Sequence, residues 1–337
     1  MEPFISVVVP LLDEEPYIER LARSLLDQDY PEDRSEILMA DGGSSDRTLE
    51  ILRSVDREGR IRVLENPRRT APAALNVLLA ATCGEVITRV DAHSYVAPDY
   101  LRTIARVMEE SGESVVGGPV RMEADTPFRR ALVEALYSRI GVGSVPYRTL
   151  RTRAYVESLQ TGSFRREVFE KVGPFDESLA VVEDLDMNTR IREAGYRLLL
   201  DPSIRFYYYP RPDLASLCRQ IVMVGRVKAR ILRKHPAIFK LKYVLPSAFV
   251  LALAASVAAI AARPLGAPRL AAAAGAGFLA VYGAIVAGFA AVKSVKLGTE
   301  AVRLLAILPA LHIGYGLGFL RGAIEAAILR GGGPAAS

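Results

Sequence analysis

Short apolar runs alternate with helix-like periodic segments through the first 93 residues. Residues 4–10 (FISVVVP) form a continuous apolar run, as a strand buried on both faces requires. The next segment, residues 16–28, has the 3.6-residue apolar spacing of an amphipathic helix. The same alternation predicts strands at 36–43, 61–66 and 86–93 and helices at 46–55 and 71–82.

This strand–helix order predicts an α/β fold of the Rossmann-like kind, a mainly parallel sheet with right-handed crossovers and helices on both faces. Four carboxylates follow the predicted strands: Asp13, Glu14, Asp41 and Asp91. Because the carboxyl ends of parallel strands meet at one edge, these groups should lie together, where ligands bind in such sheets. Four carboxylates repel each other, so a divalent metal or a cationic side chain is implied among them.

The stretch VITRVDAH (residues 86–93) ends a β-branched run on Asp91 and, two residues later, His93. A carboxylate and an imidazole at a strand end are suited to holding a ligand or a metal ion. The alternative is a simple turn, because Asp readily caps the start of a loop or helix.

The C-terminal third is far more apolar than the rest. Residues 243–262 and 270–292 contain no charged side chain over 20 and 23 positions, which is the length needed to cross a hydrocarbon core. They predict an antiparallel pair of transmembrane helices. A third run at about 302–321 contains Pro309, His312 and three glycines, and it either spans, re-enters or lies in the interface.

Charge supports a membrane location with the N-terminal part in the cytoplasm. Residues 205–242 hold ten Lys or Arg against one acidic residue, Asp213, directly before the first apolar run. The net charge of +5 therefore indicates membrane contact, since no aromatic and basic nucleic-acid module is present. Two distant cysteines, Cys83 and Cys218, predict neither a disulfide framework nor a zinc site.

Five motifs resemble, in order and approximate spacing, those of family 2 glycosyltransferases with the GT-A fold: VVVPLLDEE, ADGGSSDRT, GEVITRVDAH, TGSFRREVFEKVGPFDE and EDLDMNTRIREAGYR. The resemblance covers roughly residues 4–235 and is greatest to the membrane-attached succinoglycan-biosynthesis type, in which DAH commonly replaces DXD. It implies a GT-A glycosyltransferase domain at 1–235 and a membrane domain at 243–330. Within the former we expect a nucleotide-sugar half (1–120), an acceptor and catalytic half (121–204) and a basic amphipathic interface segment (205–242).

The resemblance assigns donor binding to seven residues: Pro10, Leu12, Glu14, Asp41, Arg69, Asn76 and Asp91. Asp41 resembles the residue that contacts the nucleobase. A carboxylate accepts from uracil and from guanine equally well, so the donor is a UDP- or a GDP-sugar. For Asp41 and Arg69 the structural alternatives are a turn residue and a solvated arginine.

The resemblance also implies a Mn²⁺ or Mg²⁺ cofactor held by His93 and Asp91, which would stabilise the diphosphate leaving group. A nitrogen ligand favours Mn²⁺ over Mg²⁺.

On the acceptor side, Thr161, Gly162 and Ser163 match the segment that lines the acceptor pocket in relatives. Glu183 and Asp184 open a predicted helix. We expect Asp184 to be the general base, with Glu183 as the alternative; the structural explanation is that acidic residues are favoured in any first helical turn.

Processive relatives carry QxxRW near the membrane, whereas here Gln220 is followed by Met223 and Val224 in place of Arg and Trp. The sequence therefore predicts a multi-pass inner-membrane, inverting enzyme that moves one sugar to a lipid-linked or membrane-proximal saccharide in polysaccharide or glycolipid synthesis. The alternatives are a polyprenyl-phosphate glycosyltransferase and a non-catalytic nucleotide-sugar-binding membrane protein. A nucleotidyltransferase is disfavoured, because no Gly-rich phosphate loop with its Lys is present.

Overall fold

The chain folds into two compact units and passes between them more than once. The computed structural model describes residues 2–142, 146–179 and 181–331. The first unit comprises residues 1–123 and 145–209, and the second comprises residues 124–144 and 210–337.

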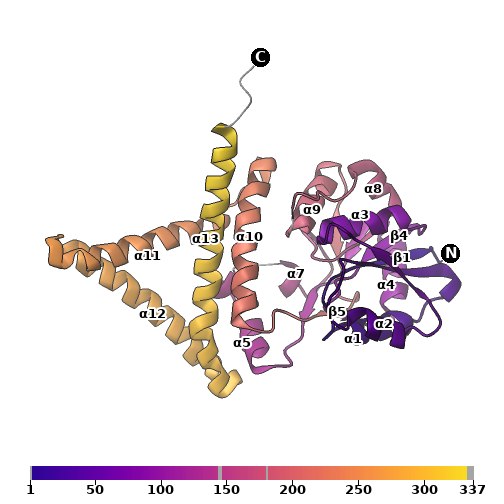
Figure 1. Ribbon diagram of the computed structural model, residues 1–337, viewed down its shortest axis with the longest axis horizontal. Coiled ribbons are helices and arrows are strands. Elements are labelled where there is room, and N and C mark those ends of the chain that lie inside the picture. Colours follow the sequence, from indigo (N-terminus) through magenta and orange to yellow (C-terminus); the bar gives the residue numbers. More distant parts are fainter. Residues whose placement is uncertain (1, 143–145, 180, 332–337) are drawn as a thin grey trace, which may run out of the picture. The chain divides into compact units, whose positions relative to one another are not determined.

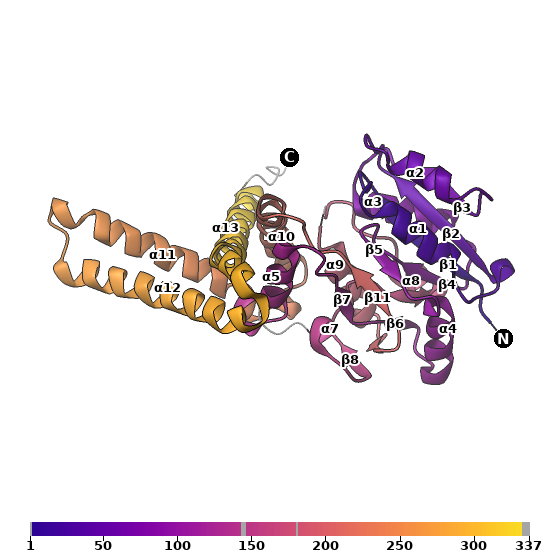
Figure 2. The ribbon, with the colours of Figure 1, turned by 90° about the horizontal axis from the view of Figure 1, so that it is seen from below.

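The first unit is the α/β part (Figures 1 and 2). Its strands are β1 (Ile5–Leu11), β2 (Ser35–Asp41), β3 (Ile61–Glu65), β4 (Val86–Arg89), β5 (Ser94–Val96), β6 (Val115–Gly117), β7 (Val120–Met122), β8 (Ala154–Val156), β9 (Ser163–Arg165), β10 (Leu198–Leu200) and β11 (Phe206–Tyr208). Its helices are α1 (Ile18–Leu26), η1 (Glu32–Arg34), α2 (Thr48–Val55), α3 (Ala71–Ala81), α4 (Tyr100–Ser111), α7 (Pro146–Thr149), α8 (Arg166–Val172) and α9 (Glu183–Glu193).

Eight strands form the main sheet in the order β3-β2-β1-β4-β9-β6-β10-β8. The pairs β1/β2, β2/β3, β1/β4 and β6/β10 are parallel, whereas β9 and β8 pair antiparallel with their neighbours. A smaller sheet, β5-β11-β7, lies beside it in the same unit. Successive βαβ units account for the parallel half, because a parallel strand pair needs a crossover connection.

Two hydrophobic cores, one on each face of the sheet, follow from the alternation of side chains along β1. Val7 and Val9 pack with α1, α2 and α4, and Val8 packs with α3, α8 and α9 on the opposite face. This arrangement confirms the predicted α/β fold with a mainly parallel sheet and helices on both faces.

The fourth strand is shorter than predicted. The sequence indicates a strand over 86–93, but β4 ends at Arg89, and Asp91 and His93 lie in the loop that leads to β5. The reason is that β4 runs out of partners: its register covers Val86–Arg89 with β1 and Val86–Thr88 with β9. Both side chains are thereby released from the sheet.

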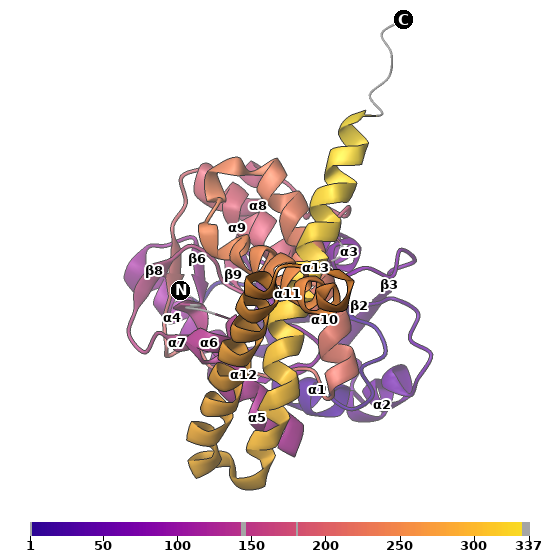
Figure 3. The ribbon, with the colours of Figure 1, turned by 90° about the vertical axis from the view of Figure 1, so that its left-hand side faces the viewer.

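The second unit is helical. It contains α5 (Pro127–Leu136), α6 (Arg139–Val142), α10 (Leu214–Lys234), η2 (Pro236–Ile238), η3 (Leu241–Tyr243), α11 (Leu245–Ala261), η4 (Arg263–Leu265), α12 (Arg269–Leu297), η5 (Gly298–Arg303) and α13 (Leu304–Gly331). Helices α11 and α12 form an antiparallel hairpin (Figure 2), and α10 lies along α13 (Figures 1 and 3).

A glycine row on α13 lets α10 approach closely. A Cβ atom at Gly318 would overlap the carbonyl oxygen of Val222, and one at Gly322 would overlap that of Arg226. Small residues at this spacing bring helix backbones together. The same interface is ionic at its other end, where Arg226 Nε and Arg230 Nη2 donate to Glu325 Oε2 at 2.7 and 3.0 Å.

One helical stretch in the described part of the chain, Arg269–Ile328, is long and apolar enough to cross a membrane. Its most apolar window has a mean hydropathy of 2.0 and is only 11% buried. Helix α11 is apolar but has 17 residues, fewer than a full crossing needs without adjustment. Helices thus form at all three predicted apolar runs, and the stretch that meets the length criterion includes α12 and most of α13.

Candidate active site

The candidate site is built at the carboxyl edge of the parallel strands β1, β2 and β4. Leu11 at the end of β1 pairs with Asp41 at the end of β2, and the Gly42 amide donates to the Leu11 carbonyl at 2.9 Å. The loops that follow these strands therefore begin side by side. The side chain of Leu12 covers Gly42, where an added Cβ would lie 3.3 Å from Leu12 Cδ1.

Two acidic residues at these strand ends, Asp13 and Asp41, bind backbone groups. Asp13 Oδ1 accepts from the Ser45 amide at 2.7 Å, so Asp13 acts as an acceptor. The Asp41 carboxylate accepts from the amides of Gly43 and Ser44 and from the Ser44 hydroxyl at 2.6 Å. Asp41 thus shapes its own turn. Because a carboxylate has about four acceptor positions, it retains capacity for a further donor.

Arg69 lies against the Asp41–Gly43 turn. A Cβ atom at Gly42 would lie 3.4 Å from Arg69 Cα, and one at Gly43 would lie 3.1 Å from Arg69 Nη1. Its neighbour Arg68 forms an ion pair with Glu177. Of the two arginines, Arg69 is therefore the one beside the predicted nucleotide loop.

Asn76 has a different environment from the other predicted donor-binding residues. Its Nδ2 donates to the Phe175 carbonyl at 3.0 Å and to Glu177 Oε1 at 2.9 Å, and its Oδ1 accepts from the Phe175 amide at 2.8 Å. The amide therefore fastens α3 to the GPFDE turn through both of its ends.

His93 is held between two oxygen atoms. Its Nδ1 lies 3.0 Å from Glu14 Oε1, and its Nε2 lies 3.2 Å from the Tyr208 hydroxyl. Both His93 and Glu14 are mostly buried, with 21% and 17% of their side chains exposed. The structure therefore joins two of the predicted site residues, Glu14 and His93, and adds Tyr208 from β11.

A buried cation connects the loop after β4 to α9. Arg89, the last residue of β4, donates from Nε to Asp91 Oδ1 at 3.0 Å, and its Nη2 lies 2.7 Å from Glu183 Oε1. Burial alone would lower the pKa of Arg89, but the negative charges of Asp91, Glu183 and Asp184 outweigh it and raise that pKa. Of the four carboxylates that follow the predicted strands, Asp91 is thus the one that these contacts pair with a cationic side chain.

The first turn of α9 carries the predicted base. Glu183 is 6% exposed and paired with Arg89, whereas Asp184 is half-buried. Asp186, two residues on, is fully buried and bonded to Arg190 Nε at 2.9 Å. Acidic side chains at this end are also favoured by the helix dipole.

The predicted acceptor-binding residues are buried at or just before β9, where that strand pairs with β4. Thr161 and Ser163 are 3% and 1% exposed. The Ser163 hydroxyl lies 2.8 Å from that of Thr88, and the Gly162 carbonyl accepts from the Arg89 amide at 3.0 Å. These residues therefore contact the strand that carries Arg89.

Backbone strain gathers in the loops of this site. Among the described residues, the non-glycine residues with positive φ are Asp13 (53°), Arg69 (56°) and Val182 (63°). A β-branched residue such as Val182 seldom adopts this conformation, and it directly precedes Glu183. Such strain concentrates at functional sites.

Sequence reasoning missed Arg89 and Tyr208. The available signal for Arg89 was a single arginine inside a β-branched run, where a charge is unfavourable unless it is paired. No local sequence pattern indicates a site role for Tyr208, because it contacts His93 from 115 positions further along the chain.

The doubly wound sheet and the charged loops at its carboxyl edge define an α/β protein that binds its ligand at that edge. The family model "Glycosyl transferase family 2" matches residues 6–173. The succinoglycan biosynthesis protein ExoA of Rhizobium meliloti is 32% identical over 245 residues, which are 72% of this chain and 74% of ExoA. The chain belongs to glycosyltransferase family 2, and its fold is GT-A-like.

Two further comparisons agree with this. A dolichyl N-acetyl-alpha-D-glucosaminyl phosphate 3-beta-D-2,3-diacetamido-2,3-dideoxy-beta-D-glucuronosyltransferase of Methanococcus voltae is 24% identical over 74% of this chain and 80% of its own length. The solved structure of the mannosyltransferase PcManGT from Pyrobaculum calidifontis, in complex with GDP-Man and Mn²⁺, has a TM-score of 0.60 at 23% identity. That alignment covers 92% of this chain and 87% of PcManGT, and it shows the fold.

Proposed function

We propose that this chain is a membrane-anchored, inverting glycosyltransferase that moves one sugar from a nucleotide-diphosphate sugar to a lipid-linked or membrane-proximal saccharide. The observation that carries the proposal is the Arg89 network, which joins Asp91 of the donor loop to Glu183 at the start of α9. A donor loop and an acidic helix start held together are what a direct displacement at the anomeric carbon needs.

The donor would lie across the loops after β1, β2 and β4. Pro10, Leu12 and Asp41 would face the nucleoside, and Arg69 would face the diphosphate. The position of Arg69 against the Asp41–Gly43 turn supports this assignment. A guanidinium is well suited to phosphate oxygens, because it donates in a planar fork.

The residues present fit a divalent cation with few protein ligands. Mg²⁺ and similar ions are commonly held by one or two carboxylates together with substrate phosphates. Arg89 contacts Asp91 through Oδ1, so Oδ2 would be the ligand atom. A carboxylate on one ring nitrogen, as Glu14 is on His93 Nδ1, orients the other nitrogen for metal binding. That nitrogen, Nε2, would have to exchange its contact with the Tyr208 hydroxyl at 3.2 Å for the cation.

The described residues contain no group of three or more His, Cys, Asp or Glu side chains arranged around a metal position. The remaining ligands would therefore come from the diphosphate and water. A bound cation would supply charge neutralisation to the leaving diphosphate. Nitrogen ligation by His93 favours Mn²⁺.

Asp184 is the better candidate for the general base. Glu183 is committed to a buried guanidinium at 2.7 Å, and a proton acceptor in such a pair would have to leave its partner unpaired. Asp184 would take the proton of the acceptor hydroxyl as that oxygen attacks the anomeric carbon from the face opposite the diphosphate. The product would then have inverted configuration.

The helical unit supports a membrane-proximal acceptor. Large apolar side chains on α11 and α12 are exposed, among them Leu251 at 57%, Val281 at 61% and Val295 at 94%. Exposed apolar surface of this extent is suited to lipid. The basic span 205–242 supports a multi-pass inner-membrane protein with a cytoplasmic catalytic unit.

The test is transfer by the full-length protein in its own membranes. Labelled UDP- and GDP-sugars are supplied with Mn²⁺, with Mg²⁺ or with EDTA, and label is followed into lipid-extractable and water-soluble products. We expect one donor to label a saccharide-bearing lipid product, most strongly with Mn²⁺, and we expect NMR to show an inverted anomeric centre.

Two other outcomes separate the alternatives. An acid-labile product on a bare polyprenyl phosphate would identify a polyprenyl-phosphate glycosyltransferase. Saturable donor binding with no transfer to any fraction would identify a non-catalytic binding protein and refute the proposal.

A further inference from the structure

Arg89 is a nearly buried cation with more than one acidic neighbour. Its side chain is 11% exposed, as is that of Asp91, and that of Glu183 is 7% exposed. Both Nε and Nη2 contact Asp91 Oδ1 at 3.0 Å, and Nη2 also reaches Glu183. Because charges interact strongly in such a partly dry environment, this side chain governs how closely the acidic groups can approach.

The same residue is tied to the sheet through its backbone. The Arg89 amide donates to the Gly162 carbonyl of the segment before β9, so Arg89 cannot shift along the strand without breaking that bond. Its side chain then reaches α9, which no strand register fixes. Arg89 therefore links the sheet to the first turn of α9.

The helix start that it holds follows a strained residue. The residue before Glu183, Val182, has φ of 63° and ψ of 21°, and it provides no side-chain cap for α9. A strained residue persists only where its surroundings hold it in place. The buried Arg89–Glu183 pair is one contact that can do so.

The third guanidinium nitrogen of Arg89 is not used in these contacts. Nη1 is buried and has no hydrogen-bond partner among the described residues. An unpaired buried donor is costly, and its presence at a candidate active site points to a role beyond stability.

We propose that Arg89 is a positioning residue of the transfer reaction: by holding Glu183 and Asp91 together, it fixes the first turn of α9, and with it Asp184, relative to the donor loop. This inference rests on the proposed function in assigning Asp184 as the base. Arg89 acts through its neighbours and is not itself the base.

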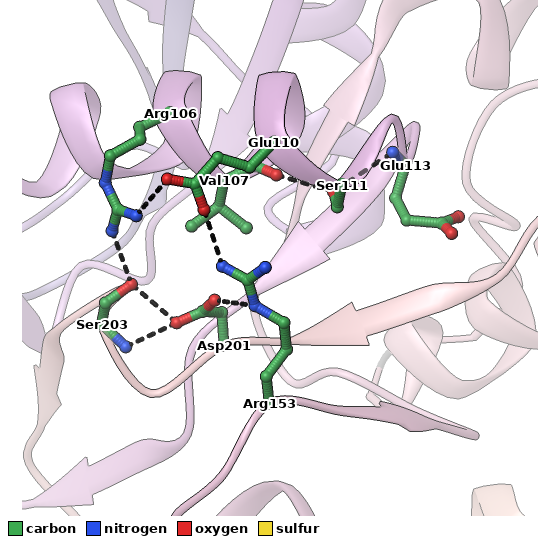
Figure 4. Close-up of polar contacts among 8 residues, drawn as sticks. All are labelled: Arg106, Val107, Glu110, Ser111, Glu113, Arg153, Asp201 and Ser203. Carbon is green, nitrogen blue, oxygen red and sulfur yellow. Dashed lines mark hydrogen bonds and ion pairs between the residues drawn. The ribbon is translucent and has the colours of Figure 1, made fainter.

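A second arginine offers a matched control. Arg153 also bridges two carboxylates, with Nε donating to Asp201 and Nη2 donating to Glu110 at 3.0 Å (Figure 4). Its network continues through Ser203 to Arg106 and contains no candidate site residue. Arg153→Met therefore removes a similar two-carboxylate bridge in the same unit.

The experiment compares Arg89→Lys, Glu183→Gln, the double variant Arg89→Met with Glu183→Gln, and Arg153→Met in the full-length protein. The double variant removes the pair together, so that Glu183 is not left as an unpaired buried charge. For each protein we measure melting temperature, the Kd for UDP and GDP with Mn²⁺, kcat and KM, and hydrogen exchange across residues 181–186.

We expect the double variant to fold, to bind nucleotide within about threefold of wild type, and to lose roughly 100-fold in kcat, the scale of a 1 Å misplacement of a reacting group. Its exchange at 181–186 should rise. Arg89→Lys keeps the charge without the fork and should recover part of kcat. Glu183→Gln still accepts a hydrogen bond from Arg89 but loses the charge, so it should keep more of kcat than the double variant. Arg153→Met should keep kcat and the exchange pattern of wild type.

A double variant with near-normal kcat, or one with unchanged exchange at 181–186, would overturn the inference. Complete loss of activity in Glu183→Gln alone would also overturn it, because Glu183 would then be the base. If wild type transfers no sugar while exchange still rises in the double variant, the proposed function fails and the link from Arg89 to α9 stands.

Discussion

At the residue scale, the site depends on how each carboxylate is occupied. Asp41 binds its own turn, Glu14 binds His93, and Glu183 binds Arg89. These pairings distinguish chemically similar groups. A carboxylate that already accepts from a cation or a hydrogen-bond donor is a poor base, because its charged form is stabilised. Glu183, which is buried against Arg89, is for this reason the weaker of the two candidates for the base role.

His93 carries the first prediction. His93→Ala should abolish most metal-supported transfer, whereas His93→Asp should retain a good part and shift the preference from Mn²⁺ toward Mg²⁺, because oxygen is the harder ligand. Transfer rates at matched concentrations of the two ions measure this. Full activity of His93→Ala with an unchanged metal response would mean that His93 only bridges Glu14 and Tyr208.

Also at this scale, sequence and structure diverge most at residues whose partners are distant. The charged strand-end residues were predictable, because strand patterns place them at one edge. The double hydrogen bonding of Asn76 to Phe175 links positions 99 apart, and no local pattern announces it. Its predicted donor contact would compete with those bonds.

At the element scale, the β1–β4 half of the sheet and its helices followed from periodicity, and the second half did not. Strands β6, β8, β9 and β10 have three residues each, too few for alternation to be distinctive. The basic segment 205–242 shows the same limit. Arg226 and Arg230 of this segment bind Glu325 of α13, a contact that no local pattern predicts.

The contact between α10 and α13 carries the second prediction. Gly318→Ala should lower the free energy of unfolding of the full-length protein in detergent by about 1–3 kcal/mol, because the new methyl group meets the Val222 backbone. Gly288→Ala on α12 is the control, since nothing lies within 4 Å of its Cβ position. Equal effects of the two substitutions would show that α10 and α13 do not pack this closely.

At the scale of the whole molecule, the chain combines a GT-A-like unit with a helical unit rich in exposed apolar residues. The basic span before α11 supports a cytoplasmic position for the α/β unit. The two cysteines allow this topology to be tested directly, because Cys83 is exposed in the α/β unit.

In a Cys218→Ser background, a membrane-impermeant maleimide should label Cys83 in inside-out vesicles and not in intact spheroplasts. The hydrogen bond to Glu36 raises the pKa of the Cys83 thiol, so labelling should be slower than at an ordinary thiol and is followed over time. Labelling in spheroplasts alone would place the α/β unit on the other side of the membrane.

The central claim is that Asp184 is the base of a sugar transfer at this site, and the kinetics of Asp184→Asn test it most directly. The substitution keeps the shape of the side chain and removes its ability to accept the proton, and Glu109→Gln, an exposed carboxylate on α4, is the control. We predict that Asp184→Asn binds the donor nucleotide with a Kd within about threefold of wild type and transfers sugar roughly 100-fold or more slowly. Turnover close to that of wild type would contradict the account.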